Sequence, residues 1–392
     1  MNLERFQNSP AGHALKVWQA QPPYWAFVPN PLPPQIEFDR SLVSTLSEAD
    51  RALGELAGLG RTLPNPNLLI RPFMRREAVL SSRIEGTQAD VADLYAYEAK
   101  QLALPLGPSA ATDSDVREVF NYVRALEYGL ERLSTLPVSL RLIREVHDIL
   151  MKGVRGEFAT PGEFRRTQNW IGRPGCTLED ATYVPPPVAE MQEALGDLEK
   201  YLYADDPLPP LMRLALIHYQ FEAIHPFIDG NGRIGRLLIS LLLINWNLQP
   251  VPLLYLSAYF ERQRNAYYDH LLGVSEHGNW RAWLEFFLRG VAVQSRDAIT
   301  RARQIQDLQS QWREQLTKTR ASAFLLRLVD SLFDAPMLTI PQAQKLLGVT
   351  YRSASQNIQK LVKAGILHDA GATPEGRVFV ARDILRAVAE TD

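Results

Sequence analysis

Residues 225–236 bring together a histidine, a carboxylate, two loop glycines and two arginines in one short stretch. The sequence there reads His225-Pro226-Phe227-Ile228-Asp229-Gly230-Asn231-Gly232-Arg233-Ile234-Gly235-Arg236. The almost unbroken apolar run that follows, from Leu237 to Trp246, predicts a buried helix. These residue types, in this order, could bind phosphate groups and move a proton.

The glycines predict an anion site just ahead of that helix. Gly230 and Gly232 allow positive φ and a close backbone approach, so successive N–H groups can point inward as an anion nest. The start of the helix adds unpaired N–H groups and a positive dipole end. Arg233 and Arg236 lie in its first turn, where two cations are unfavourable unless an anion offsets them. A nucleotide with more than one phosphate would provide that anion.

The two remaining polar side chains predict metal and proton chemistry. Asp229 precedes the nest, and Mg²⁺ is a hard ion held by few carboxylates together with phosphate oxygens. His225 is placed to take a proton from an attacking hydroxyl. Each residue taken singly also has a structural explanation, because Asp and Asn often cap helices and one Gly-x-Gly is usually only a turn. The complete string is what indicates a functional site.

The string resembles the Fic family signature, His-x-Phe-x-(Asp/Glu)-Gly-Asn-Gly-Arg-x-x-Arg, without a gap or a substitution. The resemblance implies that His225 deprotonates a Ser, Thr or Tyr hydroxyl of a target protein and that Asp229 binds Mg²⁺. It also implies an ATP phosphate site formed by Gly230, Asn231, Gly232, Arg233, Ile234, Gly235 and Arg236. The typical family reaction transfers AMP from ATP to the hydroxyl and releases pyrophosphate. Gly232 favours this reaction, because the phosphate-transferring Doc-like branch has lysine there.

A second motif ends the helix expected at residues 67–86, where the sequence reads Ser81-Ser82-Arg83-Ile84-Glu85-Gly86. A carboxylate at this end of a helix faces the negative end of the dipole, although an exposed glutamate tolerates that at little cost. The motif resembles the Fic inhibitory sequence, (Ser/Thr)-x-x-x-Glu-(Gly/Asn), which begins here with Ser81. The resemblance implies that Glu85 pairs with Arg236 and withholds this arginine from the γ-phosphate of ATP.

Length and composition indicate a cytoplasmic protein of more than one domain. A chain of 392 residues is expected to form two or three domains, and 46% hydrophobic and 22% charged residues are ordinary values. The single cysteine, Cys176, excludes an internal disulfide framework and a cysteine-rich zinc site. The N-terminus lacks a signal pattern and the longest apolar run is too short to span a bilayer, so we expect no membrane contact.

Hydrophobic periodicity predicts a mainly α-helical fold. Apolar residues recur with helical spacing over 41–59, 115–133, 139–152, 211–224 and 280–293. We expect four parts in chain order: an N-terminal region (1–114), a Fic helical core (115–294), a helical linker (295–318) and a C-terminal domain (319–392).

Two segments lack helical spacing. Residues 1–37 are rich in proline and aromatic residues, and we expect them to lie over the surface with Trp18, Trp25 and Phe27 packed inward. Residues 167–187 read as two short extended runs around a turn-rich tip, which predicts a β-hairpin. Its position resembles the flap of Fic proteins, which implies that a target backbone pairs with its edge. An ordinary structural hairpin is the alternative; the edge residues that we expect are Ile171, Gly172, Tyr183 and Val184.

Residues 257–268 resemble the family segment that ends in a paired aromatic, here Tyr267 and Tyr268. The resemblance implies that Tyr267 lies near the nucleotide base. Packing alone would also explain a tyrosine pair.

The last portion of the chain follows a different pattern. Helices are predicted at 321–333, 341–347 and 351–364, followed by a hairpin near 366–380, which resembles a winged helix-turn-helix. The third helix carries Arg352, Lys360 and Lys363 and no acidic residue, which suits a phosphate backbone. The same pattern occurs in modules that bind only protein, so DNA binding and protein docking stay equally supported.

Three functions follow from these motifs. The leading interpretation is an autoinhibited protein adenylyltransferase that uses ATP and Mg²⁺ to modify a hydroxyl of another protein or of its own chain. The second is a nucleotide-sensing DNA-binding transcription regulator, and the third is a phosphotransferase that uses the same site. Fic proteins are often dimers, so the resemblance also implies a homodimer.

Overall fold

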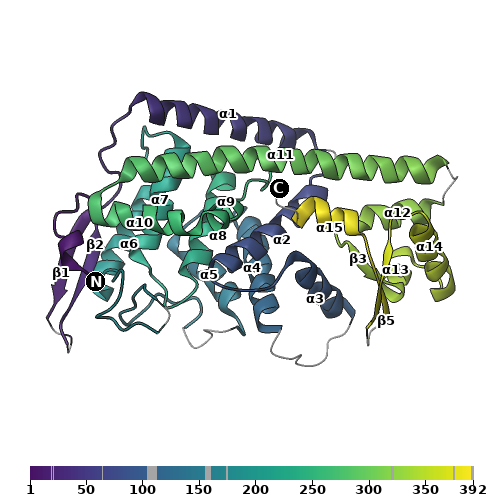
Figure 1. Ribbon diagram of the computed structural model, residues 1–392, viewed down its shortest axis with the longest axis horizontal. Coiled ribbons are helices and arrows are strands. Elements are labelled where there is room, and N and C mark those ends of the chain that lie inside the picture. The colour runs from purple at the N-terminus through teal and green to yellow at the C-terminus, as the bar shows by residue number, and fades with distance from the viewer. Residues whose placement is uncertain are drawn as a thin grey trace.

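The computed structural model describes residues 1–18, 20, 22–63, 65–103, 113–154, 160–173, 175–318, 322–373 and 376–389. The fold is mainly α-helical, with two small antiparallel sheets (Figure 1). The first ten helices form the larger part of the molecule: α1 (Arg40–Thr62), α2 (Asn67–Ile84), α3 (Val91–Ala103), α4 (Asp113–Arg132), α5 (Leu140–Met151), α6 (Val188–Leu202), α7 (Pro210–Ile224), α8 (Asn231–Asn245), α9 (Ser257–Arg262) and α10 (Arg264–His277).

Helix boundaries follow from local sequence. Asp39 caps α1 by accepting a hydrogen bond from the Leu42 N–H at 2.9 Å, and Ser139 caps α5 in the same way. A proline occupies the first position of α7, where its missing N–H costs nothing. The helices expected at 41–59, 67–86, 115–133, 139–152 and 211–224 are all confirmed, with ends shifted by three residues or fewer.

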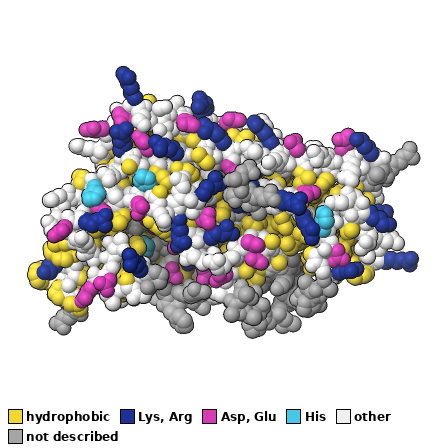
Figure 2. Space-filling view, viewed as in Figure 1, with side chains coloured by type: hydrophobic (Ala, Val, Ile, Leu, Met, Phe, Trp, Pro, Cys, Tyr) yellow, Lys and Arg dark blue, Asp and Glu magenta, His cyan; other side chains and the backbone are white. Residues whose placement is uncertain are grey.

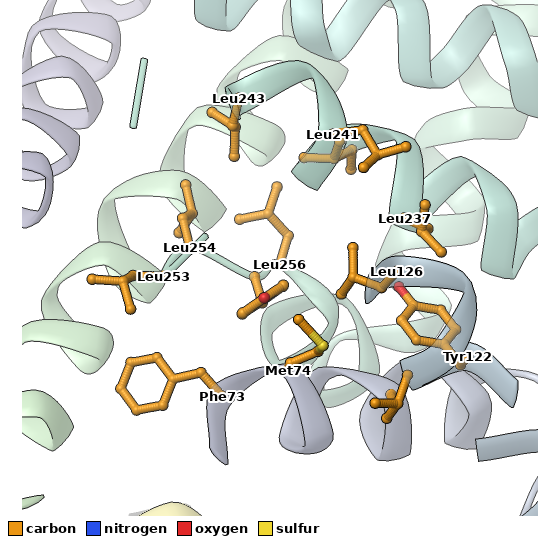
Figure 3. Packing of buried hydrophobic residues seen from close by; sticks show 14 of the residues in the cluster. Phe73, Met74, Tyr122, Leu126, Leu237, Leu241, Leu243, Leu253, Leu254 and Leu256 are labelled. Atoms are coloured by element: carbon orange, nitrogen blue, oxygen red, sulfur yellow. The ribbon is translucent and has the colours of Figure 1, made fainter. Parts of the chain in front are cut away.

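Helix α8 runs through the centre of the hydrophobic core. Its leucines, among them Leu237 and Leu241, face Met74 of α2 and the Tyr122 and Leu126 side chains of α4 (Figure 3). All five of these side chains are almost fully buried. Burial of this kind contributes about 1.5–3 kcal/mol per large aliphatic side chain. The core therefore fixes the helix whose first turn carries Arg233 and Arg236.

The N-terminal segment is more regular than the sequence suggested. Strands β1 (Gly12–Val17) and β2 (Tyr24–Pro29) pair in antiparallel register as a hairpin. Phe27 is fully buried, as expected, and its ring lies 6.1 Å from that of Tyr183. The expectation for Trp18 was wrong: its side chain is 66% exposed and stacks against the ammonium of Lys16.

One helix joins the two parts of the molecule. Helix α11 (Trp280–Lys318) is continuous over 39 residues and includes both the helix expected at 280–293 and the one expected at 295–318. It lies alongside α1 and reaches the C-terminal elements (Figure 1). None of the helices within the described ranges combines the length and apolar character needed to cross a bilayer.

The C-terminal elements form a small α/β unit with the sheet order β3-β5-β4. Its final helix, α15, turns back and packs against α2 and α11. On the face shown in Figure 2, basic and acidic side chains are interspersed over the larger part of the molecule, and several Lys and Arg side chains protrude from this unit. Its elements are α12 (Ala323–Leu332), β3 (Met337–Thr339), α13 (Ile340–Leu347), α14 (Tyr351–Lys363), β4 (His368–Thr373), β5 (Gly376–Val380) and α15 (Arg382–Ala389).

Candidate active site

The loop between α7 and α8 contains the signature residues. His225 ends α7 in the left-handed region at φ 49°, and Gly230 begins α8 at φ 80°, where glycine is favoured. The side chain of Asn231 braces the loop: its Oδ1 accepts from the Phe227 N–H and its Nδ2 donates to the Phe227 carbonyl, both at 2.8 Å. The two ends of the loop are therefore fixed by the helices that flank it.

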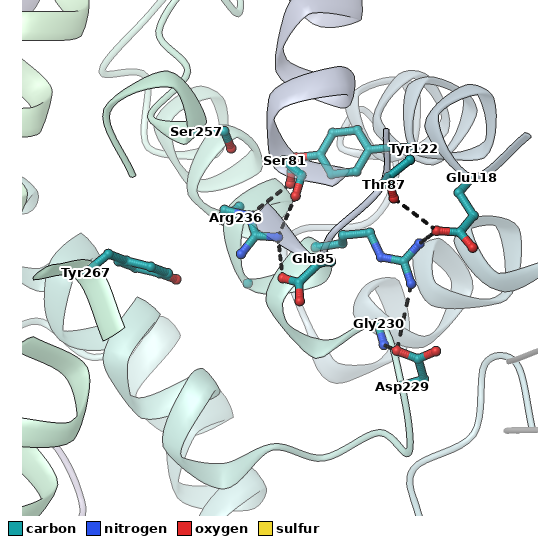
Figure 4. A network of polar contacts seen from close by, with 12 residues as sticks. Ser81, Glu85, Thr87, Glu118, Tyr122, Asp229, Gly230, Arg236, Ser257 and Tyr267 are labelled. Atoms are coloured by element: carbon teal, nitrogen blue, oxygen red, sulfur yellow. Dashed lines mark hydrogen bonds and ion pairs between the residues drawn. The ribbon is translucent and has the colours of Figure 1, made fainter. Parts of the chain in front are cut away.

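Arg236 is held by the C-terminal end of α2 (Figure 4). Its Nε donates to Ser81 Oγ at 2.9 Å, and its Nη2 donates to the Ser81 carbonyl at 2.9 Å and to Glu85 Oε1 at 2.6 Å. The guanidinium is buried, whereas about a third of the Glu85 side chain, 36%, stays exposed to solvent. The expected pairing of Glu85 with Arg236 is thus present, and Ser81 contributes two of the three contacts.

Electrostatics favour the charged form of both partners. Burial raises the pKa of Glu85, but the Arg236 guanidinium outweighs this effect and leaves the pKa below its usual value. Burial lowers the pKa of Arg236, and the carboxylate of Glu85 reverses that shift, so the pKa lies above its usual value. Solvent around Glu85 screens part of this attraction. Both groups are therefore charged at neutral pH.

Glu85 occupies the space that a side chain at position 232 would need. A Cβ at this position would overlap Glu85 Oε1 and would lie 2.9 Å from Arg236 Nη1. Glu85 therefore sits directly over the first turn of α8, where the free backbone N–H groups attract an anion. In this state the glutamate carboxylate is the anion beside the helix start.

The other signature arginine faces the opposite side of the loop. Arg233 is 4% exposed, and its Nη1 donates to Glu118 Oε2 of α4 at 3.3 Å. Its Nη2 lies 3.8 Å from Asp229 Oδ1. Arg233 thus ties α8 to α4 and also places positive charge beside Asp229.

Asp229 could supply a carboxylate to a divalent cation. Its Oδ1 accepts from the Gly230 N–H at 2.6 Å, and half of the side chain is exposed. Among the described residues, no three His, Cys, Asp or Glu side chains cluster as metal ligands. A single carboxylate fits Mg²⁺, which keeps several waters and takes further oxygen ligands from phosphates.

His225 is arranged as a proton acceptor. Its Nδ1 lies 3.3 Å from the Glu222 carbonyl, which can only accept, so Nδ1 carries the proton and the Nε2 lone pair is free. Burial lowers the pKa of His225 to about 4, which keeps the ring neutral at pH 7. The main chain is fixed as well, because Arg165 and Asn169 both donate to the His225 carbonyl.

A cleft of about 600 Å³ opens over these groups. His225, Gly232 and Arg236 line it together with Glu85. Flap residues and residues of helix α10 also line it, among them Ile171, Gly172, Tyr183, Tyr267 and Tyr268. The cleft is therefore large enough for a nucleotide and is bordered by a segment that could hold a second substrate.

The predicted hairpin at 167–187 is only partly present, because the two runs meet in a single antiparallel bridge. Ile171 and Tyr183 exchange both backbone hydrogen bonds, at 2.8 and 3.0 Å. Ile171 is 38% exposed, and Gly172 next to it is also exposed, so this side of the bridge is accessible. Val184 is not: it is fully buried and its carbonyl accepts from the Phe27 N–H at 2.8 Å. Strand β2 thus already occupies the edge expected at Val184.

Tyr267 lies at the base of the cleft with its ring only 1% exposed. Its hydroxyl donates to His218 Nε2 at 2.8 Å, and His218 Nδ1 donates to the Gly235 carbonyl at 3.1 Å. Tyr267 thereby links α10 to the signature helix through a buried histidine. The accessible member of the pair is Tyr268, which is 41% exposed.

Comparison with known proteins gives the family. Residues 137–243 match the family described as Fic/DOC family, and residues 43–131 match its partner, Fic/DOC family N-terminal. The chain belongs to the Fic family. Protein adenylyltransferase Fic of Drosophila grimshawi is 31% identical over 172 residues, which are 43% of this chain and 32% of that protein. Protein adenylyltransferase Fic of Nematostella vectensis is 28% identical over 213 residues, 53% of this chain and 45% of that protein.

The matched segments therefore span less than half of these curated relatives. Among solved structures, a Fic family protein from Desulfovibrio desulfuricans G20 superposes with a TM-score of 0.56 at 20% identity, covering 89% of this chain and 98% of that one. A Fic domain containing signaling protein from Bacteroides thetaiotaomicron VPI-5482 gives a TM-score of 0.50 at 19% identity, with 67% and 96% coverage. At these identities the likeness shows the Fic fold.

His147 of α5 was not predicted to take part in the site, but its side chain supports the loop between α7 and α8. Its ring stacks on Phe227 with centroids 3.7 Å apart and planes 5° from parallel. The Gly162 N–H donates to Nδ1 at 2.9 Å, so the proton lies on Nε2, which donates to the Asp229 carbonyl at 3.0 Å. The one sign of this role in the sequence is a histidine on the apolar face of a predicted helix.

We expect His147→Phe to destabilise the protein by about 1–3 kcal/mol, because the Asp229 carbonyl and the Gly162 N–H lose a partner. His147→Gln should cost less, since an amide can both donate and accept in the same place. Denaturant unfolding measures both, with His277→Phe on the surface as the control. A smaller loss for Phe than for Gln would contradict the role of these hydrogen bonds.

Proposed function

We propose that this Fic protein is a protein adenylyltransferase that transfers AMP from ATP to a Ser, Thr or Tyr hydroxyl of a protein. The observation that carries the proposal is the shared cleft: a neutral His225, the first turn of α8 and Arg236 all line it. The relatives named protein adenylyltransferase Fic support the reaction type. Catalysis of this kind depends mainly on positioning and on charge stabilisation.

The proton and the leaving group can be followed atom by atom. The target hydroxyl would give its proton to Nε2 of His225 while its oxygen bonds to the α-phosphorus of ATP. The bond from that phosphorus to the oxygen that bridges to the β-phosphate breaks, and pyrophosphate leaves. Nearby phosphate charge would raise the pKa of His225 from about 4 toward neutrality, which would make it a stronger base.

The first turn of α8 is the binding site that we propose for the ATP phosphates. Backbone N–H groups from residues 231–233 and the guanidinium of Arg236 would neutralise the triphosphate. Asp229 would hold Mg²⁺, which supplies positive charge between the phosphate oxygens when it is bound. A phosphotransferase that uses the same site is the alternative, and the mass added to a modified protein distinguishes the two.

The contact between Glu85 and Arg236 supports autoinhibition. While Arg236 donates to Glu85 and to Ser81, three of its five N–H donors are directed at α2. The Glu85 carboxylate also lies against Gly232, where an outer phosphate would come. ATP would then bind only in a pose that does not align the α-phosphorus with the attacking hydroxyl.

The exposed flap backbone at Gly172 supports docking of an extended segment of the target by strand addition next to His225, whereas the backbone groups of Ile171 are already bonded to Tyr183. A second copy of this chain in a homodimer is one candidate for the target. Tyr268, exposed in the cleft, offers a surface for the adenine ring, with Tyr267 beneath it.

The exposed cations of α14 favour a second, compatible function. Arg352, Lys360 and Lys363 are all exposed, on a helix that follows α13 after a short turn. We propose that this C-terminal unit is a winged helix-turn-helix that binds the DNA backbone; a docking surface for a protein is the alternative.

We expect His225→Ala to lower AMP transfer from α-phosphate-labelled ATP about 10²–10⁴-fold, because a general base contributes this much. ATP affinity, measured by calorimetry, should stay within about threefold, since the proposed phosphate site is untouched. His277→Ala, at an exposed position that does not line the cleft, is the control. Full labelling by the His225 variant would remove this residue from the reaction.

Glu85→Gly should raise AMP transfer roughly 10-fold or more, because it removes a charged hydrogen bond that holds Arg236 away from the γ-phosphate. Incubation with Mg²⁺, labelled ATP and a cell lysate, followed by mass spectrometry, measures the rate and the added mass. The double variant Glu85→Gly/Arg236→Ala should lose the gain. Equal rates for Glu85→Gly and the parent would exclude autoinhibition by this pair.

Replacement of Arg352, Lys360 and Lys363 by alanine should weaken DNA binding and reduce the salt slope of log K by about 2–3, since each cation neutralises about one phosphate. Mobility shifts of the full chain over a salt series give this slope. Alanine at three exposed cations of the larger part, Arg141, Lys200 and Arg289, is the control. No shift of the parent at low salt would exclude DNA as the partner.

A further inference from the structure

The carboxylate of Glu222 lines the cleft but takes no part in the proposed reaction. Glu222 lies on α7, three residues before His225, and the residue is partly exposed. Its Oε1 is buried without a hydrogen-bond partner, and within the described part of the chain the carboxylate forms no hydrogen bond or ion pair. A buried polar atom without a partner is uncommon in a folded protein and calls for an explanation.

Helix α8 leaves room for this carboxylate at Gly235. A Cβ at position 235 would overlap Glu222 Oε1 and would lie 3.3 Å from His218 Cε1. Gly235 lies inside the helix and outside the left-handed region, so the backbone conformation does not require a glycine. The Fic signature leaves this position open as well. Glycine is a poor helix former, so the space that it provides for Glu222 is the reason we infer for its presence.

Glu222 lies between the two ends of the cleft. One turn earlier on the same face of α7 is His218, whose Nε2 accepts from the Tyr267 hydroxyl at 2.8 Å. After Glu222 comes His225, whose Nδ1 lies 3.3 Å from the Glu222 carbonyl. A nucleotide with its phosphates at the start of α8 and its base beside Tyr267 and Tyr268 would therefore place its ribose next to Glu222.

The chemistry of a carboxylate suits a ribose at this place. An ionised carboxylate only accepts hydrogen bonds, and its charge repels phosphate groups. In the uncharged part of ATP, the hydrogen-bond donors are the two ribose hydroxyls and the amino group of adenine. The ribose is bonded directly to the α-phosphate, on which His225 would act, so its hydroxyls are the donors nearest to Glu222. A carboxylate that accepts from a ribose hydroxyl is also the solution found in dinucleotide-binding folds.

We propose that Glu222 is a specificity-determining residue that accepts hydrogen bonds from the 2′- and 3′-hydroxyls of the nucleotide. The inference rests on the proposed function, because it concerns the nucleoside half of the same cleft. Glu222 receives no proton in the reaction and does not touch the phosphates. Its effect is to make the site select ribonucleotides over deoxynucleotides.

The test compares ATP with 2′,3′-dideoxy-ATP in the full-length Glu85→Gly protein. The kcat/KM for AMP transfer should be about 10–100-fold higher for ATP, because hydrogen bonds to a charged group contribute this much. Adding Glu222→Ala should lower this preference below about threefold, through a loss with ATP alone. Glu222→Gln keeps one acceptor oxygen and should retain part of the preference. Glu193→Ala, exposed on α6, is the control and should retain all of it.

The ratio of the two nucleotides separates this role from a structural one. A structural role of Glu222 would lower transfer from both nucleotides alike, and an unchanged ratio in Glu222→Ala would overturn the proposal. Equal kcat/KM values in the Glu85→Gly protein itself would overturn it as well, whether or not Glu222→Ala folds. If Glu222→Ala instead lost only the preference for ATP over the purine ribonucleoside triphosphate without the amino group, Glu222 would contact the base, and the ribose contact would be excluded.

Failure of the proposed function would give a different result, which is no AMP transfer from ATP by the Glu85→Gly protein. Calorimetry with ATP and 2′,3′-dideoxy-ATP in the presence of Mg²⁺ then tests the ribose contact separately. Tighter binding of ATP that Glu222→Ala abolishes would support the contact, and equal binding of the two nucleotides would overturn it.

Discussion

The contact between the Arg236 guanidinium and the Glu85 carboxylate, laid over the start of α8, is the constraint on which the site depends. A helix start has free N–H groups and a positive dipole end, and Arg236 adds a full charge to it. Such a place must hold an anion. In this structure the anion is the Glu85 carboxylate, whose Oε1 lies 2.6 Å from Arg236 Nη2. The same field that suits a triphosphate therefore holds the Glu85 carboxylate.

The scaffold explains why this contact is so well defined. Helix α8 is buried on nearly every side, and α2 packs against it through Met74 and its neighbours. This packing fixes the backbone positions of Arg236 on α8 and of Glu85 at the end of α2. Ser81 adds two hydrogen bonds to the same guanidinium. On the other side, His147 and Asn231 fix the loop that carries His225 and Asp229. Release of Arg236 thus requires a movement of the end of α2 or of the Glu85 side chain, which is partly in solvent.

The features that depend on contiguous residues could be predicted from the sequence. The signature string, the inhibitory motif and the main core helices could be recognised because each is a contiguous run whose residues act together. Contacts between segments that are distant in the sequence could not be recognised. His147 stacks on Phe227, which lies 80 residues later in the chain. The Val184 carbonyl accepts a hydrogen bond from the N–H of Phe27, which belongs to a strand in the proline-rich segment where no strand was predicted. The helix α11 was divided in the prediction because its polarity changes where it leaves the core, although its backbone continues. The sequence predicted a β-hairpin at 167–187, whereas the two extended runs pair through one bridge only. Extended residues form a sheet only where a partner strand lies alongside them, and that pairing is not visible in the local sequence.

The central claim is that residues 230–236 receive the phosphates of ATP once Glu85 no longer holds Arg236. Crystal structures of the parent and of the Glu85→Gly protein with ATP and magnesium test it most directly. Phosphate density is expected against the N–H groups at the start of α8 in both crystals, with the γ-phosphate on Arg236 only in the variant. Density for ATP elsewhere, or no phosphate in this loop in either crystal, would contradict it.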